Sequence, residues 1–345
     1  MRLCLLFLWA VLGVARAGEA VGLEFRFDSE FARAASAAVA AGGADAAATE
    51  RLRALPAMAA MVRKNRLPNA DAFIASLDRL AAQPAAREAA RSVAAELALP
   101  GGGKYAAVAQ QVSALLRVYV PPGFAARLNV VFVYGGNAGG FAFEDVPDDV
   151  YVNLARFTQA SSQELAETVA HELFHAVQTH VMPLPPTANA QTPASQAGPL
   201  WMRRVLYDLL QEGTAELFTH PAAERPASAY SERSKRRSER NAQRQRGMVS
   251  LLETVAWRLR YAPPRDEDAY DRIYALLFYG DWDEPAYDLG WIMAHTIEQH
   301  DGQAAIFRLL QGEPKQFVLR YAELARGNPQ LPQFGEDFLQ ALRAL

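Results

Sequence analysis

The sequence contains one cysteine, six histidines and almost no net charge. The cysteine is Cys4, close to the N-terminus, so no disulfide is expected in the rest of the chain and packing must stabilise the fold. A net charge of −3 gives no reason to expect nucleic acid or another polyanion as a partner of the whole molecule. With 345 residues, 51% of them hydrophobic, the chain can bury a full core as one large domain or two unequal ones.

The apolar run at residues 3–14 is too short for an ordinary membrane span. Arg2 precedes it, and Ala15-Arg16-Ala17 follows it as an A-x-A cleavage site, which is typical of a secretory signal peptide. A buried core helix is the alternative, but the N-terminal position and the A-x-A ending favour a signal. We therefore expect residues 1–17 to be removed. The mature protein would be secreted or periplasmic, without stable insertion into a membrane.

Residues 18–100 are predicted to form a helical N-terminal region. Between residues 28 and 98 the chain is rich in alanine and poor in glycine, and apolar residues recur at helical spacing, which indicates three to five helices. The PGGG segment at 100–103 interrupts this pattern and is the candidate boundary. Residues 101–345 would then form a catalytic domain with a helical C-terminal part.

A small β-sheet is predicted just before the central motif of the chain. Residues 128–134 are β-branched and aromatic, as in a buried strand, and residues 150–154 indicate another strand. Residues 141–143 have the length of a short edge strand, and Asp148 and Asp149 are expected to turn the chain. Because helices are predicted nearly everywhere else, the expected fold class is α+β and predominantly helical.

The segment 168–177, TVAHELFHAV, contains an H-E-x-x-H motif. His171 and His175 are four residues apart and therefore lie on the same face of a helix, where each ring can offer a nitrogen to one metal ion. Glu172 is offset around the helix, beside the position that the metal keeps open. This arrangement is typical of zinc peptidases, in which the glutamate is the general base.

The helix that carries the motif is predicted to run from Ser161 to His180. Ser161 and Glu164 have the S-x-x-E form of a capping box, and a proline-rich stretch at 182–199 indicates an exposed loop after the helix. The alternative is an amphipathic helix whose histidines bind no metal. The uncharged flanks of the motif argue against it, because they would bury the imidazoles, and burying them unpaired is costly.

A second glutamate pair provides a candidate third ligand. Catalytic zinc takes three protein ligands and keeps one position open. Glu212 and Glu216 are again four residues apart, on a helix predicted over residues 200–219. We assign Glu212 as the ligand and Glu216 as the acceptor of a hydrogen bond from one histidine ring. Gly213 and Ala215 would let this helix approach the histidine helix closely. Two solvated glutamates on a surface helix are the alternative.

The two motifs together resemble those of the gluzincins, the thermolysin-like clan of zinc metallopeptidases. In that clan a glutamate on a later helix is the third ligand, and an acidic residue four positions on supports a ligand histidine. More narrowly, the chain is similar to an uncharacterised group of secreted zinc-dependent peptidases with a helical N-terminal region. The resemblance, closest over residues 150–219, implies a zincin-like catalytic core with one Zn²⁺ ion. The stretch between His175 and Glu212 is longer than in thermolysin-like enzymes, and Gln211 replaces their asparagine, so the substrate type does not carry over.

Further catalytic and binding residues are predicted on either side of these motifs. A developing oxyanion needs a donor besides the metal. Tyr287 or His295 could supply it, since the similar group has a comparable Tyr-x-x-Gly helix after its glutamate ligand; a packing role is the alternative for both. The sheet edge at Gly140 and Phe141 would align an extended substrate by strand addition.

Two charged segments follow the motifs. Residues 225–246 are strongly basic and are predicted to be a solvated helix or loop, with a docking patch for an anionic surface as the alternative. Residues 266–288 are acidic but lack the spacing of an EF-hand, so an acidic loop is expected rather than a calcium site. Residues 303–345 are apolar and helical and are expected to close the core.

These residues predict a zinc-dependent metallopeptidase that hydrolyses peptide bonds in a peptide or protein substrate. One zinc ion would be held by His171, His175 and Glu212. Glu172 would take a proton from the attacking water and pass it to the leaving amine. Two alternatives stay open: a non-enzymatic envelope protein that contains zinc, and a zinc amidohydrolase acting on a non-peptide or cell-wall substrate. Glu172 argues against the first, because a purely structural site has no use for that carboxylate.

Overall fold

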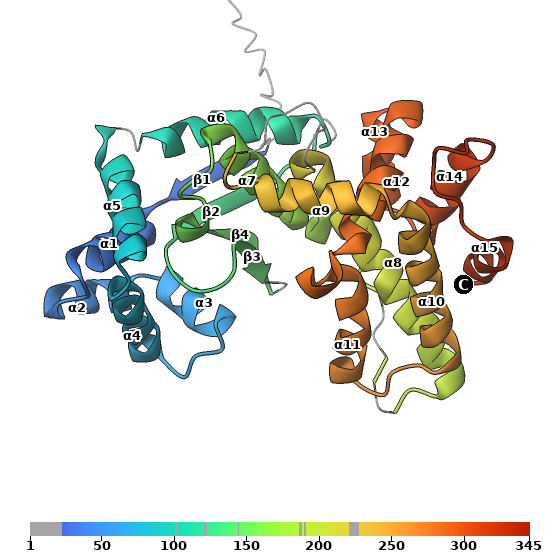
Figure 1. Ribbon diagram of the computed structural model, residues 1–345, viewed down its shortest axis with the longest axis horizontal. Coiled ribbons are helices and arrows are strands. Elements are labelled where there is room, and N and C mark those ends of the chain that lie inside the picture. The colour runs from blue at the N-terminus through green and yellow to red at the C-terminus, as the bar shows by residue number, and fades with distance from the viewer. Residues whose placement is uncertain are drawn as a thin grey trace, which may run out of the picture.

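The computed structural model describes residues 23–100, 103–120, 123–143, 145–185, 188–189, 191–220 and 228–345. Within these ranges the chain forms fifteen α-helices and one four-stranded sheet, so the predicted α+β, predominantly helical fold is confirmed (Figure 1). The predicted signal peptide, residues 1–17, lies outside the described residues. None of the described helices is both long and apolar enough to cross a membrane.

The sheet is small and mixed. Its strands are β1 (Glu24–Asp28), β2 (Arg127–Val133), β3 (Gly140–Phe143) and β4 (Val146–Asn153). They lie in the order β1-β2-β4-β3, with β2 parallel to both β1 and β4, and β3 antiparallel to β4. β3 is therefore an edge strand, as predicted. The prediction of a turn at Asp148 and Asp149 is wrong. Both lie within β4, where His180 and Asn129 form hydrogen bonds with their carboxylates.

Five helices follow β1, at the upper end of the predicted three to five. They are α1 (Glu30–Ala41), α2 (Ala46–Ala54), α3 (Ala57–Lys64), α4 (Ala70–Ala81) and α5 (Pro84–Ala98). α1 packs against α5 and against β2. β1 was not predicted, although Phe25 and Phe27 alternate with charged residues at the period of a strand. Because β1 pairs with β2, the chain on both sides of residue 100 shares one sheet and one core.

The next helices are α6 (Lys104–Arg117), α7 (Ser162–Val181) and α8 (Ala194–Thr219). The capping box predicted for α7 is confirmed: Glu164 N donates to Ser161 Oγ at 3.1 Å and Ser161 N donates to Glu164 Oε2 at 2.8 Å. The loop predicted at 182–199 is shorter than expected, because α8 begins at Ala194 and contains Pro199. Packing stabilises this first part of α8, since Trp201 stacks on Tyr270 with ring centroids 4.6 Å apart.

The C-terminal half is helical and packs around α8. Its helices are α9 (Glu232–Ala242), α10 (Gln245–Tyr261), α11 (Glu267–Phe278), α12 (Pro285–Asp301), α13 (Gln303–Leu310), α14 (Lys315–Ala325) and α15 (Glu336–Arg343). In Figure 1, α1 to α5 lie at the left, α10 to α15 lie at the right, and α7 lies between the two groups. α8 packs mainly against α12, and also against α7 and α10.

Gly213 contacts a different helix from the one predicted. It was expected to bring α8 close to α7, but it lies at the crossing of α8 and α12. A Cβ atom at Gly213 would lie 2.6 Å from the Cα atom of Gly290 on α12. The two backbones therefore touch where both helices carry glycine, and this contact brings the first turns of α12 next to Glu212.

The basic segment (residues 225–246) contacts the acidic segment (residues 266–288), and the sequence did not predict this contact. Arg240 and Arg244 of the basic segment pair with Asp283, and Arg237 pairs with Glu284. Asp288, buried on α12, accepts hydrogen bonds from Ser238 and Asn241 of α9 and pairs with His220 at the end of α8. The prediction of a solvated helix or loop is confirmed for the helix but not for its full solvation, because one face of α9 packs on α12. Residues 221–227 lie outside the described residues.

Candidate metal centre and active site

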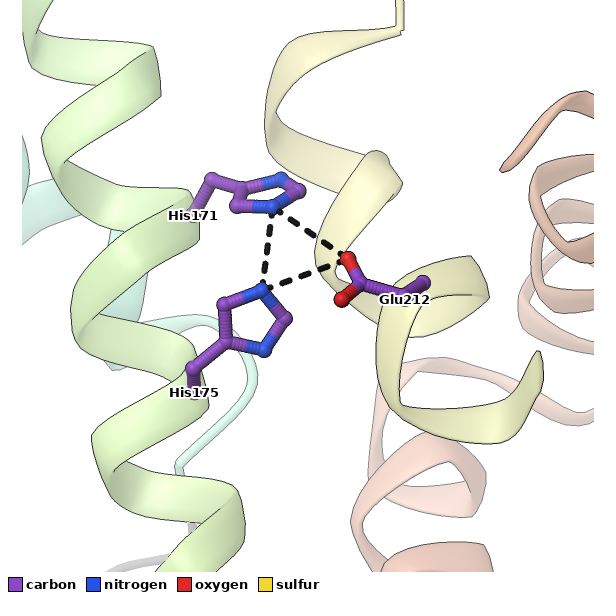
Figure 2. Close-up of side chains that lie close together, drawn as sticks. All are labelled: His171, His175 and Glu212. Atoms are coloured by element: carbon purple, nitrogen blue, oxygen red, sulfur yellow. Dashed lines mark hydrogen bonds and ion pairs between the residues drawn. The ribbon is translucent and has the colours of Figure 1, made fainter. Parts of the chain in front are cut away.

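Two helices bring three potential ligand atoms together. Figure 2 shows His171 and His175 on α7 pointing toward Glu212 on α8. The two Nε2 atoms lie 3.1 Å apart, and Glu212 Oε2 lies 3.7 Å from His171 Nε2 and 3.4 Å from His175 Nε2. In a tetrahedral zinc site with ligands about 2.05 Å from the metal, the ligand atoms lie roughly 3.3 Å apart. The three residues therefore fit one metal ion with little movement.

A buried glutamine orients the ring of His175. Gln178, one turn later on α7, donates from Nε2 to the backbone oxygen of Gln211 and to Thr214 Oγ1, each at 2.8 Å. Since a backbone oxygen can only accept, the amide oxygen of Gln178 must face His175 Nδ1, which lies 2.7 Å away. Nδ1 of His175 is therefore protonated. Burial works to lower the pKa of His175, but Glu212 and Glu172 raise it to about 9, so Nε2 also carries a proton that a binding metal would displace.

A threonine connects His171 to Glu216. The hydroxyl of Thr219 donates to Glu216 Oε2 at 3.3 Å and lies 3.0 Å from His171 Nδ1. Because its proton points to the carboxylate, Thr219 accepts a hydrogen bond from His171 Nδ1–H, and Nε2 of His171 is free for a metal. The sequence analysis predicted that Glu216 accepts a hydrogen bond directly from a histidine ring. In the structure Thr219 lies between them, one helical turn after Glu216.

At this centre the carboxyl of Glu212 is ionised and the imidazole of His171 is neutral. Burial works to raise the pKa of Glu212, but His175 and His171 together outweigh this effect and the pKa lies below its ordinary value. A hydrogen bond from Tyr287 lowers it further. Burial lowers the pKa of His171 to about 3, and the charge of His175 adds to the effect. An ionised carboxylate and a neutral imidazole are the forms that bind zinc.

Glu172 lies against the first residue of β3. A Cβ atom at Gly140 would lie 2.2 Å from Glu172 Oε1, so the carboxylate occupies the space that a larger residue would need. Burial raises the pKa of Glu172 to about 7; the charge of His175 opposes the rise, Glu212 adds to it and Lys64 opposes it. Gly140 was predicted as a substrate contact. The structure shows it as the residue that makes room for Glu172.

The side chain of Phe141, predicted to contact substrate, is buried. It is 4% exposed and stacks on Tyr151, with ring centroids 4.9 Å apart. A substrate at this edge can therefore meet only the backbone groups of Phe141. The strand addition predicted here needs nothing more, since it uses main-chain hydrogen bonds.

Two cavities adjoin Glu172. The larger has a volume of about 430 Å³ and lies toward the N-terminal half of α7, where His171, Glu172 and Thr219 line it. The smaller, about 170 Å³, lies toward the C-terminal half, between His175 and the β3 residues Ala142 and Phe143. Glu172 lines both cavities. An extended molecule bound across Glu172 would therefore have space on either side of the metal ligands.

A comparison with protein families identifies the family of this chain. The family model described as "Putative zinc dependent peptidase" (DUF5700) matches residues 35–330, more than four fifths of the chain. The chain belongs to this family. The matched range contains all three potential ligands and Glu172. No curated protein matches the chain. No solved structure matches it either.

In this member of the family, the two predicted oxyanion donors lie in different surroundings. Tyr287 hydrogen-bonds Glu212 and so supports a metal ligand. His295, two turns further along α12, stacks on Trp291 with ring centroids 4.9 Å apart and lies 2.9 Å from Gln299 Nε2. It lines neither of the two cavities beside Glu172. The structure thus brings Tyr287 to the centre but not His295.

Tyr230 is a site residue that the sequence did not indicate. It lines the larger cavity, packs on Phe157 and places its hydroxyl 3.4 Å from Thr168 Oγ1, one turn before Glu172 on α7. Burial raises the pKa of Tyr230, so its hydroxyl stays protonated. No spacing in the sequence relates Tyr230 to the motif. Gln178, by contrast, lies one turn after His175 and could have been predicted from that spacing.

Proposed function

We propose that this protein is a zinc metallopeptidase of the glutamate-liganded type. The observation that carries the proposal is the convergence of His171, His175 and Glu212 beside Glu172, in a centre that two cavities adjoin. The family description supports the same reaction. Zinc in such a site supplies Lewis-acid activation of water and of the scissile carbonyl.

Glu172 is the general base in this proposal. It accepts a proton from the attacking water on a carboxylate oxygen and donates it to the leaving amine. Contact with Gly140 limits where the carboxylate can lie, and Gln178 and Thr219 hold the two imidazoles in fixed orientations. The backbone edge of β3 would hold the substrate extended across Glu172.

We assign Tyr230 as the hydrogen-bond donor to the developing oxyanion, in place of Tyr287 and His295. Its protonated hydroxyl lies in the wall of the cavity that begins at Glu172, and in the structure it makes a long hydrogen bond of 3.4 Å to Thr168 Oγ1, which it would exchange for the oxyanion. Tyr287 is engaged with Glu212, and His295 lies away from both cavities. A donor placed before the reaction starts stabilises the negative charge as it forms.

We further propose that the protein acts outside the cytoplasm, because residues 1–17 have the features of a signal peptide. N-terminal sequencing of the exported protein is then expected to begin at Gly18. An exported protein that keeps residues 1–17 would contradict this part of the proposal.

Glu172→Gln provides the test of the reaction. The variant keeps the metal ligands, so it is expected to bind one zinc ion like the wild type while hydrolysis of a peptide library falls by roughly 10²–10⁴-fold. Glu167→Gln, on the same helix, is the control and should leave hydrolysis unchanged.

Three outcomes would contradict the proposal. They are unchanged hydrolysis in Glu172→Gln, metal-free wild-type protein, and a zinc-loaded wild type that cuts no peptide. In the third case a non-peptide amide would be the substrate, or the zinc would be structural.

A further inference from the structure

Part of the lining of the larger cavity comes from residues outside the metal centre. At its outer end the cavity has a wall of α9 residues and of the segment before α12, including Ser234, Arg233 and Gly280. The α9 residues of this wall belong to the basic segment, residues 225–246. The cavity therefore leads from Glu172 directly to a group of cationic side chains.

The cations of this wall differ in their partners. Arg237 pairs with Glu284, and Arg240 pairs with Asp283, so these charges are neutralised within the protein. Arg233 has no carboxylate partner among the residues that the structure describes. Its guanidinium lies on the side of the cavity that Gly280 lines, with Nη2 3.6 Å from where a Cβ atom of Gly280 would lie. Arg233 thus provides an exposed positive charge at the mouth of the cavity.

The carboxylates at the inner end of the cavity already have partners. Glu164 accepts from Ser161 N and from Ser228 Oγ, and Glu216 accepts from Thr219. The smaller cavity on the other side of Glu172 has no lysine or arginine in its lining. The two cavities therefore differ in their cations: the smaller has none in its lining, whereas the larger has Arg233 beside the paired Arg237 and Arg240 and the likewise engaged Lys235.

We propose that the α9 cavity binds a carboxylate-bearing residue of the substrate next to the scissile bond, and that Arg233 selects it. This inference rests on the proposed peptidase function. The carboxylate is either that of a glutamate or aspartate side chain or that of the substrate's C-terminus. A guanidinium recognises both, because its planar N–H groups match a carboxylate. Ser234 adds a hydroxyl donor to the same wall.

Matched peptides test the inference on the zinc-loaded enzyme. The peptides carry Glu, Gln or Lys in turn at each position flanking the cleaved bond, with the C-terminus free or amidated. The wild type should prefer Glu over Gln at one position, or a free over an amidated C-terminus, by roughly fivefold in kcat/KM at low salt. The preference should appear mainly in KM and weaken as salt is added.

Variants of Arg233 then assign the preference to this residue. Arg233→Gln should remove it, and Arg233→Glu should replace it with a preference for Lys. Arg236→Gln is the matched control: Arg236 lies on the same helix, its side chain is 68% exposed and it pairs with Glu232 away from the cavity. This control should keep the wild-type preference. Because Arg233 and Arg236 are both exposed, Arg233→Gln, Arg233→Glu and Arg236→Gln should all melt at the wild-type temperature.

The outcomes separate this inference from the proposed function. If the wild type cuts peptides in a Glu172-dependent way but shows no preference for a carboxylate, the role of Arg233 is overturned while the peptidase function stands. The same holds if Arg236→Gln loses the preference as fully as Arg233→Gln does. If the zinc-loaded wild type cuts none of the peptides, the function and the inference fall together.

Discussion

The carboxylate of Glu172 has almost no space to spare on the side of β3. The nearest position, Gly140, allows it only because a glycine has no Cβ atom. Hydrogen bonds that His171 and His175 donate to Thr219 and Gln178 fix the orientations of the two ligand rings. At the scale of single residues, the centre is prepared by neighbours whose own chemistry is unremarkable: a glycine, a threonine and a glutamine.

Gly140→Ala is expected to lower kcat about 100-fold, because the added methyl group must displace Glu172 by roughly 1 Å and such a shift has this cost. Zinc content should stay the same, since the three atoms nearest to the Cβ position of Gly140 all belong to Glu172, which is not a ligand. The measurement is kcat together with metal stoichiometry. Gly139→Ala is the control: its Cβ atom would lie 3.8 Å from the nearest atom, on Phe157, and activity should be kept. Full activity in Gly140→Ala would show that Glu172 has more freedom than the structure indicates.

At the scale of elements, α8 is the helix on which the site depends. It carries Glu212, contacts α7 on one side and crosses α12 on the other. The crossing places Tyr287 beside Glu212, and it exists in this form because Gly213 and Gly290 bring the two backbones into contact. A glycine within a helix costs about 1 kcal/mol relative to alanine, so this contact must offset the loss.

Gly213→Ala is expected to lower the free energy of unfolding by about 1–3 kcal/mol, as overpacking does, in spite of the better helix propensity of alanine. The new Cβ atom would meet backbone atoms of Gly290 at 2.6 Å, and these cannot rotate away. Denaturant unfolding measures the change. Gly247→Ala on α10 is the matched control, since no atom lies within 4 Å of its Cβ position. It should be neutral or up to about 1 kcal/mol more stable. Equal stability of the two variants would contradict the role of the crossing.

At the scale of the whole molecule, the ligands come from two helices that are separate along the chain. α7 packs on the sheet and on α6, whereas α8 packs on the C-terminal helices α10 and α12. A metal held by His171, His175 and Glu212 would therefore join the sheet-containing part of the protein to its C-terminal helices. No disulfide is expected to do this, because the single cysteine is Cys4.

Removal of the metal is accordingly expected to lower the melting temperature. At a free zinc concentration a hundred times Kd, binding contributes about 2.7 kcal/mol to the stability of the folded state, and a chelator removes this contribution. Thermal unfolding with and without chelator measures the shift, and added zinc should reverse it. His175→Ala should show no response to the chelator. An identical melting temperature for chelated and zinc-loaded wild type would argue against a metal at this site.

Local spacing was enough to predict much of this protein. The α+β class, the β3 edge, the start of α7 at its capping box and the pairing of His171 with His175 follow from residues within a few positions of one another. On a helix, such residues lie on one face whatever the rest of the chain does. Glu212 was also within reach, because a catalytic zinc site with two histidines needs a further ligand.

Only the tertiary structure decided which distant segments meet. Gly213 touches α12 instead of α7, Thr219 lies between His171 and Glu216, and Arg240 of the basic segment pairs with Asp283, 43 positions further along the chain. Composition shows that such charges and small residues exist, but not which partner each one packs against. Those partners are set by how the helices cross. The position of the α9 cations that line the cavity leading from Glu172 is therefore set by the packing of α9 on α12, which local spacing does not predict.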